Sequence, residues 1–364
     1  MTQTAIPYVF MRGGTSRGPY FNIADLPKER NILADVLMSA IGAGHVLNID
    51  GIGGGNPVTT KAAMLNVSSD PWADIDYLFA QVSVEDTCVD FKPTCGNILS
   101  GVAAASVEMG LYPAGNKKTK IKIRSVNTGA RIISTIHTDG KNVIYNGTKS
   151  IDGVPGSSAP VELRFMDVAG SLTGSLLPTG SAKNEIDGVL VTCIDVAMPM
   201  VIARADSFGL TGYEQIDELS QNKNLFKAME TIRIAAGELM GMGNVSQSVT
   251  PKFGLLAPAI SGGTVAARYF MPWTVHPSMA VTGSQCIASC LLTPGSVAEG
   301  MIKVPKAGPF NISIEHPSGS MDVIIDYKIS NNELHHQSAG LVRTCRKLAE
   351  GKVFVPTSVW NGEA

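Results

Sequence analysis

The stretch Thr94-Cys95-Gly96-Asn97-Ile98 places a thiol on a glycine turn directly before an apolar helical pattern. From Ile98 to Met109 apolar residues recur at spacings of four, three and four, the period of one helix face, and Gly110 then provides a stop signal. The pattern predicts that Cys95 lies at the N-terminus of a helix. Free backbone N–H groups and the positive end of the helix dipole stabilise a thiolate or a bound carboxylate there. We interpret this stretch as the centre of an active site.

The composition excludes several classes of protein. The chain has 364 residues, a net charge of −2 and only 16% charged residues, so it lacks the basic surplus expected of a protein that binds nucleic acid. No run of residues approaches the eighteen or more apolar positions that a membrane-spanning helix needs. The 38 glycines and 20 prolines favour many short strands and tight turns. We therefore expect a soluble, strand-rich protein of two domains, in which binding of a small anion would need local Arg or Lys.

The six cysteines, at positions 88, 95, 193, 286, 290 and 345, form no CxxC pair, and the N-terminus lacks a secretory signal pattern. Reduced thiols and a cytoplasmic location are expected. Cys95 is predicted to be functional, and the other five are interpreted as core residues. Cys286 and Cys290 have a spacing that suits two metal ligands on a helix, but His or carboxylate partners are missing, so no metal site is predicted.

The histidines show no metal-ligand spacing either. His335-His336 is expected in a surface loop. His276 precedes the turn described below and is either a substrate contact or a structural residue.

The glycine-rich stretch over residues 49–57 begins like the dinucleotide-binding fingerprint G-x-G-x-x-G. Asn56 stands in place of its third glycine and Pro57 does not open a helix, so we exclude that function. Lys61 follows at the start of an expected strand, where its residue type leaves both a solvated and a functional lysine open.

Hydrophobic patterns predict the remaining elements. Strands are expected over 6–11, 62–67, 77–84, 121–126, 131–137, 143–145, 161–165 and 189–194 and from about 251, and helices over about 28–41 and 222–239.

The second half of the chain repeats the pattern of the Cys95 stretch. Ser278 leads through three apolar residues into Thr282-Gly283-Ser284, and residues 287–291 then form a short apolar helical face. Aligning Thr282 with Cys95 gives a separation close to half the chain, which favours a duplicated fold with two helix N-termini facing a cleft. We expect domains over 1–185 and 186–364, with the alternative that the final segment packs back on the first domain.

Arginines in this sequence are candidates for binding carboxylates, because a guanidinium group pairs with a carboxylate through two parallel hydrogen bonds. Arg17 is the strongest candidate, since it lies beside Ser16 in the glycine loop over residues 12–18. For Arg12 and Arg268 surface ion pairing is the alternative interpretation.

Taken together, these residues resemble the PrpF family of isomerases, and within it most closely the 4-oxalomesaconate tautomerases. The resemblance runs nearly end to end and rests on residues 11–18, 49–54, 76–82, 95–99, 151–156, 191–195, 211–214 and 315–319. It implies an α+β, diaminopimelate-epimerase-like fold of two similar domains. Each domain is then a strand-rich, barrel-like layer around a central helix, and the active site lies in the cleft between domains.

The resemblance also implies a pair of acid–base residues. In two-thiol racemases and epimerases of that fold, one cysteine from each domain faces the substrate carbon. Here Thr282 stands where the second thiol would be, and the second group of the family is a lysine that maps onto Lys61. Cys95 and Lys61 are thus expected to catalyse a 1,3-proton shift, keto–enol or allylic, without a cofactor, in an unsaturated di- or tricarboxylic acid. Which of the two removes the proton stays open.

Other residues are expected to bind that acid. Fixed donors at the two helix N-termini would stabilise the developing enolate, and hydroxyl and guanidinium groups would hold the outer carboxylates. The predicted substrate-binding residues are Ser16, Arg17, Gly96, Asn97, Arg268, Ser278, Thr282, Gly283 and Ser284.

4-Oxalomesaconate is the expected substrate, which implies a role in the catabolism of aromatic compounds. Isomerisation of 2-methylaconitate or 3-methylitaconate by the same residues is the first alternative. An accessory role beside an aconitase-like enzyme and a non-catalytic module that binds organic acids are the others. The expected partner is the small anionic substrate, with no nucleic acid and no membrane, and relatives of this fold suggest a homodimer by analogy.

Overall fold

The computed structural model describes residues 2–363 and divides the chain into two units. Unit 1 comprises Met1–Leu163 and Val342–Ala364, and unit 2 comprises Arg164–Leu341. The chain passes between the units within strand β8 (Pro160–Met166) and again within strand β16 (Glu333–Pro356). The sequence-based boundary at residue 185 thus lies beyond the point where the chain leaves unit 1, and the C-terminal segment belongs to unit 1.

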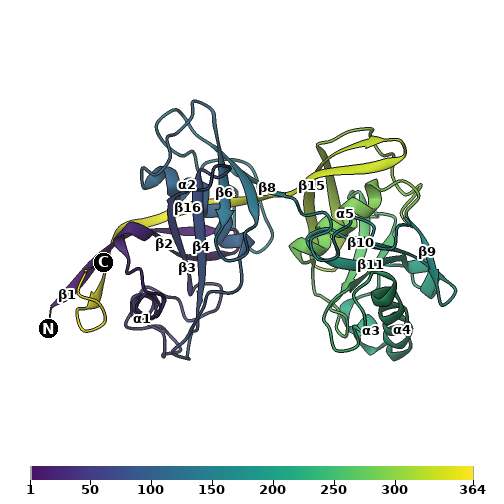
Figure 1. Cartoon of the computed structure of the whole chain (residues 1–364), viewed down its shortest axis with the longest axis horizontal. Coiled ribbons are helices and arrows are strands. Elements are labelled where there is room, and N and C mark those ends of the chain that lie inside the picture. Colours follow the sequence, from purple (N-terminus) through teal and green to yellow (C-terminus); the bar gives the residue numbers. More distant parts are fainter. Residues whose placement is uncertain (1, 364) are drawn as a thin grey trace. The chain divides into compact units, whose positions relative to one another are not determined.

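Unit 1 is a ring of strands around a helix (Figure 1). The order is β1 (Gln3–Gly13), β2 (Ser16–Asn22), β3 (Lys61–Val67), β4 (Ile75–Val82), β6 (Lys118–Ser125), β7 (Arg131–His137), β8 and β16. Pairing of β16 with β1 closes the ring, and the short β5 (Val89–Asp90) pairs with β4. Helix α2 (Gly96–Glu108) packs against β1, β2, β3, β4, β6 and β7, and its residues 98–106 are all buried. Helix α1 (Arg30–Ile41) lies on the outer face.

Unit 2 has the same plan. Its strands are β9 (Asn184–Ile186), β10 (Val189–Asp195), β11 (Pro199–Arg204), β12 (Lys252–Ala257), β13 (Val265–Phe270), β14 (Phe310–His316), β15 (Gly319–Ser330) and part of β16. Helix α5 (Val281–Leu292) packs on one face of this layer, and α4 (Lys223–Leu239) packs on the other, preceded by the short α3 (Ile216–Gln221). Short 3-10 helices, η1 (Ile23–Asp25) and η2 (Ala205–Phe208), complete the elements.

Strand pairing repeats between the units. The series β1–β2, β2–β3, β3–β4, β4–β6 and β6–β7 alternates antiparallel, parallel, antiparallel, parallel and antiparallel. The series β10–β11, β11–β12, β12–β13, β13–β14 and β14–β15 alternates in the same way. In both units the first parallel connection carries an outer helix, α1 or α4, and the second carries the central helix, α2 or α5. The predicted α+β fold of two similar, strand-rich layers around central helices is confirmed.

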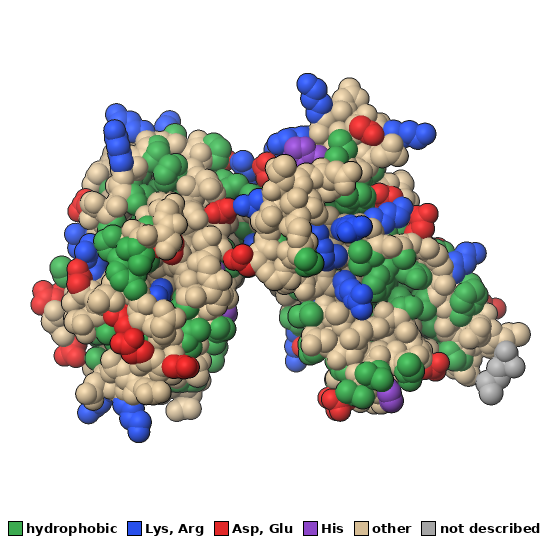
Figure 2. Space-filling view, turned by 180° about the vertical axis from the view of Figure 1, so that it is seen from behind, with side chains coloured by type: hydrophobic (Ala, Val, Ile, Leu, Met, Phe, Trp, Pro, Cys, Tyr) green, Lys and Arg blue, Asp and Glu red, His purple; other side chains and the backbone are tan. Residues whose placement is uncertain are grey.

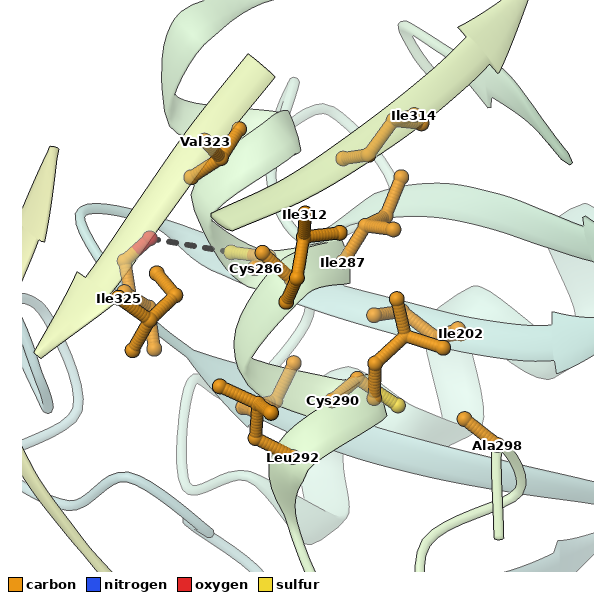
Figure 3. Packing of buried hydrophobic residues seen from close by; sticks show 14 of the residues in the cluster. Ile202, Cys286, Ile287, Cys290, Leu292, Ala298, Ile312, Ile314, Val323 and Ile325 are labelled. Atoms are coloured by element: carbon orange, nitrogen blue, oxygen red, sulfur yellow. Dashed lines mark hydrogen bonds between the residues drawn. The ribbon is translucent and has the colours of Figure 1, made fainter. Parts of the chain in front are cut away.

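The core around α5 shows why most cysteines are structural. Cys286 and Cys290 lie among aliphatic side chains of α5, β14 and β15 (Figure 3). Burial raises the pKa of the Cys286 thiol to about 12 and that of Cys290 to about 11, so neither is a thiolate near neutral pH. Cys193 and Cys345 are buried as well. The interpretation of Cys88 as a core residue is wrong, because it is exposed in the β4–β5 connection.

Two local predictions were wrong. Residues 143–145 form no strand, and Val143 makes only an isolated bridge with Thr138. His335 and His336 lie within β16 instead of a surface loop, since β15 and β16 extend further than their polar sequence indicates. The other expected strands and helices correspond to observed elements, with ends that differ by a few residues.

The surface carries both signs of charge. Acidic and basic side chains are interspersed over the face shown in Figure 2, in keeping with the 29 basic and 31 acidic residues of the chain. Over residues 2–363, no helix is long and apolar enough to cross a membrane.

Candidate active site

Cys95 is the N-cap residue of α2. Its backbone is extended, with φ −135° and ψ 106°, while its carbonyl accepts the N–H of Leu99 at 2.9 Å. The thiol makes no capping hydrogen bond and is half-buried. The N–H groups of Gly96, Asn97 and Ile98, in the first turn, have no acceptor within the helix. The predicted place of Cys95 at a helix N-terminus is confirmed.

The glycine loop between β1 and β2 packs on this helix end. Asn97 Nδ2 donates to Thr15 Oγ1 at 3.0 Å, and Asn97 Oδ1 accepts the N–H of Thr15 at 3.4 Å. A Cβ at Gly13 would lie 2.5 Å from the Asn97 carbonyl oxygen, and one at Gly14 would lie 2.2 Å from Asn97 Oδ1. Only glycine permits this approach, so two motifs far apart in the sequence meet at one helix end.

Strand alternation separates Ser16 from Arg17. Ser16 and Tyr20 share the face of β2 that is turned to α2, where the Tyr20 hydroxyl donates to the Ile98 carbonyl. Ser16 is buried at this face. Arg17 points to the opposite face, where its exposed guanidinium group lies 5.9 Å from the centre of the Phe10 ring. Ser16 is thus brought to the α2 end, and Arg17 is not.

Lys61, the first residue of β3, is directed to the same interior face. Its neighbour Ala62 packs in the core beneath α1, so alternation turns Lys61 toward α2. Its Nζ donates to Gln81 Oε1 and lies 5.4 Å from the centre of the Phe79 ring. A Cβ at Gly18 would lie 1.8 Å from the Lys61 carbonyl oxygen, so the glycine loop contacts Lys61 as closely as it contacts the helix.

Two aromatic residues of β4 connect Lys61 with Cys95. Tyr77 and Phe79 are two positions apart on one strand and therefore share its interior face. Lys61 lies over the Phe79 ring, and the Tyr77 hydroxyl donates to the Cys95 carbonyl at 3.4 Å. Burial raises the pKa of Tyr77 well above its ordinary value, so this hydroxyl stays protonated. Lys61 and Cys95 therefore stand on one face of unit 1.

The equivalent helix of unit 2 begins earlier than predicted. Ala280 is the N-cap of α5, and its carbonyl accepts the N–H of Ser284 at 2.9 Å. Ser284 is buried, and its hydroxyl donates to the Val281 carbonyl at 2.8 Å. Ser284 thus has no free N–H to offer a ligand. The free donors are the N–H groups of Val281, Thr282 and Gly283, in place of the expected pair at 283 and 284, and Ala280 takes the position of Cys95.

Ser278 lies just before α5 and is half-buried. Its N–H donates to His276 Nδ1 at 3.0 Å, which requires that this ring nitrogen is unprotonated. The His276 ring packs against Tyr269 with centres 5.6 Å apart, and burial lowers the pKa of His276. Of the two interpretations of His276, these contacts favour the structural one.

Arg268 is directed away from α5. Its neighbours Ala267 and Tyr269 pack in the core around α5, so alternation along β13 turns Arg268 to the face that α4 covers. There it is buried, its Nε donates to the Glu214 carbonyl at 2.9 Å, and its Nη1 donates to the Ala267 carbonyl at 3.1 Å. Burial lowers the pKa of Arg268. The structure therefore does not bring Arg268 to the α5 end where Ser278 and Thr282 lie.

We expect Arg268→Met to destabilise the protein without weakening substrate binding. The change removes two buried hydrogen bonds and leaves the Glu214 carbonyl without this donor, so the free energy of unfolding should fall by about 1–3 kcal/mol. Urea unfolding and KM measured on the same preparation test this. A KM raised tenfold with unchanged stability would restore Arg268 as a carboxylate ligand.

Comparison with known proteins identifies the family. The chain matches the family model described as PrpF protein over residues 3–356. It belongs to the PrpF family. It is 46% identical over 351 residues to "Putative isomerase YbhH" of Escherichia coli (strain K12), which covers 96% of this chain and 99% of that protein. It is 41% identical over 365 residues to "4-oxalomesaconate tautomerase" of Pseudomonas putida, which covers 100% of this chain and 99% of that protein.

A solved structure agrees with this fold. The crystal structure of methylitaconate-delta-isomerase matches this chain with a TM-score of 0.88 at 28% identity, over 99% of this chain and 97% of that one. The predicted family is confirmed, and this PrpF protein is an enzyme of the isomerase class.

Three residues beside Lys61 and Cys95 in this candidate site were not predicted from the sequence. Tyr77, Phe79 and Gln81 lie within the motif over residues 76–82, but only the pairing of Lys61 with Gln81 in the β3–β4 register places them beside the catalytic candidates. A strand register is a long-range property that residue spacing within one strand does not contain. Alternation along β4, read together with that register, would have found them.

A pocket of about 340 Å³ opens at the end of β4, and its wall includes Gln81. Glu85, Asp86 and Asp90 line it, so it would repel a substrate that carries several carboxylates. Within residues 2–363, no group of three or more His, Cys, Asp and Glu side chains is arranged to hold a metal ion.

Proposed function

We propose that this protein catalyses a cofactor-independent 1,3-proton shift in an unsaturated di- or tricarboxylic acid, with 4-oxalomesaconate as the substrate. The observation that carries this proposal is the placement of Lys61 and Cys95 on one face of unit 1, connected through Phe79 and Tyr77. The names of relatives support the reaction class, and the 41% identity to 4-oxalomesaconate tautomerase favours that acid.

The two groups divide the proton transfer between them. One of Lys61 and Cys95 removes a proton from the substrate, which leaves a dienolate, and the other gives a proton to the far end of the conjugated unit. The number of protons on the substrate is unchanged, so no redox partner is needed.

The N-terminal end of α2 supplies the donors for the negative charge. The free N–H groups of Gly96 and Asn97 suit a carboxylate or the developing enolate, because they are fixed before the reaction starts. Ser16, buried at the same end, adds a hydroxyl. Within unit 2, the N–H groups of Val281, Thr282 and Gly283 at the start of α5 are free donors of the same kind.

Gly96→Ala tests the donor role. A Cβ at Gly96 would meet no atom within 4 Å, and its backbone is helical, so alanine should fold as well and should raise the free energy of unfolding by about 0.5–1 kcal/mol. The methyl group would nevertheless stand where a ligand approaches the N–H groups, so kcat/KM should fall about 10²-fold.

Gly351→Ala is the matched control, because a Cβ there also meets no atom within 4 Å. It should leave kcat/KM unchanged. Unaltered activity in Gly96→Ala would remove the α2 end from the substrate-binding site.

The competing substrates are methylated acids. The similarity to methylitaconate-delta-isomerase supports 3-methylitaconate, and 2-methylaconitate would use the same residues. An ultraviolet assay of the purified protein with each of the three acids, run in deuterated water to detect exchange, separates them. Turnover of 4-oxalomesaconate alone supports the proposal. Turnover of a methylated acid alone assigns the isomerisation of that acid to the enzyme. No turnover of any of the three acids contradicts an isomerase of this substrate class.

A further inference from the structure

Gln81 is the residue that holds the Lys61 side chain. The two residues stand directly opposite each other in the antiparallel β3–β4 pair, and Lys61 Nζ donates to Gln81 Oε1. The acceptor is an amide oxygen and not a carboxylate. Lys61 is therefore oriented without an ion pair to this partner, and its charge is not neutralised by it.

The orientation of the Gln81 amide is fixed by its other end. Nε2 lies 3.2 Å from the Pro57 carbonyl, 3.3 Å from Thr60 Oγ1 and 3.1 Å from the Val82 carbonyl. The Thr60 hydroxyl donates its proton to the Val82 carbonyl at 2.8 Å. Thr60 Oγ1 can therefore only accept a hydrogen bond from Gln81 Nε2. Because three acceptors surround one end of the amide, that end must be nitrogen, and the oxygen faces Lys61.

We propose that Gln81 is a positioning residue for Lys61. Its amide oxygen fixes the Lys61 amine over the Phe79 ring and leaves the positive charge of Lys61 free to pair with an anionic substrate. The inference rests on the proposed function of Lys61 and deepens it. A carboxylate at this position would hold Lys61 as a permanent ammonium ion, whereas an acid–base group has to change its protonation state in each turnover.

The neighbouring charges do not supply that carboxylate. Asp90 of β5 stands opposite Gln81 in the antiparallel β4–β5 pair, and its Oδ1 accepts the N–H of Lys92 at 2.8 Å. Glu85 and Asp86 line the pocket behind Gln81. The ionisable residues at the two ends of α2 are Cys95, its N-cap, and Glu108. These ionisable groups are unchanged in the variants described below, so a change in the acetylation of Lys61 reports on the residue at position 81.

Gln81→Glu tests the proposal directly. The pH dependence of Lys61 acetylation by acetic anhydride, followed by mass spectrometry, measures its protonation without substrate or turnover. The new carboxylate should move the midpoint of that curve up by about one unit or more, and should move the pH profile of kcat in the same direction. Gln221→Glu, which adds the same charge at an exposed position in unit 2, should move neither.

Gln81→Met is the second variant, for the case in which Gln81→Glu does not fold. It removes the acceptor at similar length, so Lys61 should be acetylated faster at a fixed pH and kcat should fall about tenfold with KM within threefold. An acetylation curve that is unchanged in both variants overturns the proposal. Wild-type protein inactive on all three acids would contradict the proposed function instead, and acetylation would still decide whether Gln81 holds Lys61.

Discussion

Cys95→Ser is expected to lower kcat by about 10²–10⁴-fold while leaving the protein folded or slightly more stable. A serine hydroxyl is far too weak an acid to take part in proton transfer near neutral pH, so the whole contribution of an acid–base group is lost. The N-cap of α2 makes no side-chain bond in the wild type, and serine is a favourable N-cap residue, so the helix gains up to about 1 kcal/mol. Steady-state rates and thermal unfolding on one preparation measure both effects.

Cys88→Ser is the matched control. Cys88 is an exposed thiol on the same unit, and its replacement should change neither the rate nor the unfolding temperature. Full activity of Cys95→Ser would contradict a chemical role for the thiol, and full biological activity of Cys95→Ser together with a Lys61 variant would favour an accessory role.

Cys95→Ser also decides whether Lys61 or Cys95 removes the proton from the substrate. If Lys61 removes the proton, Cys95→Ser should still exchange that proton with deuterated water although it forms no product. If Cys95 removes it, both exchange and turnover disappear. Nuclear magnetic resonance of the recovered substrate distinguishes these cases.

Local sequence signals located the first helix end and misplaced the second. Cys95 sits where the apolar period begins, and its helix starts there. At the second helix Thr282 has the residue type of an N-cap, but the helix begins after Ala280, which makes no side-chain capping bond. Packing of the α5 core overrides the local preference, so a capping signal alone gave the wrong first turn.

For a related reason, the sequence does not show on which face of its strand a side chain lies. All six residues of β13 are buried, because helices cover both faces of the strand, so no polar alternation tells which way Arg268 points. Arg17 and Ser16 are adjacent in sequence and share one motif, although adjacent strand residues point to opposite faces. The fold class could be predicted from hydrophobic periodicity and family resemblance alone. The orientation of the site residues depends on strand register, which the sequence does not show.

Lys61→Met is expected to reduce kcat by about 10²–10⁴-fold, because the second acid–base group is removed. The side chain is half-buried at the start of β3, and its loss leaves Gln81 Oε1 without this donor, so the free energy of unfolding should fall by about 1–3 kcal/mol. Lys120→Met, at an exposed position on β6, is the control for removing a positive charge from unit 1 and should be fully active.

Lys61→Arg separates proton transfer from electrostatic binding. Arginine keeps the positive charge and can still donate to Gln81, but it does not lose a proton in proteins. If Lys61 transfers a proton, Lys61→Arg should be as inactive as Lys61→Met while its KM stays closer to that of the wild type. If Lys61 only attracts the carboxylates, Lys61→Arg should keep most of the rate, and that result would leave Cys95 as the sole acid–base group and make a 1,3-shift between two protein groups untenable.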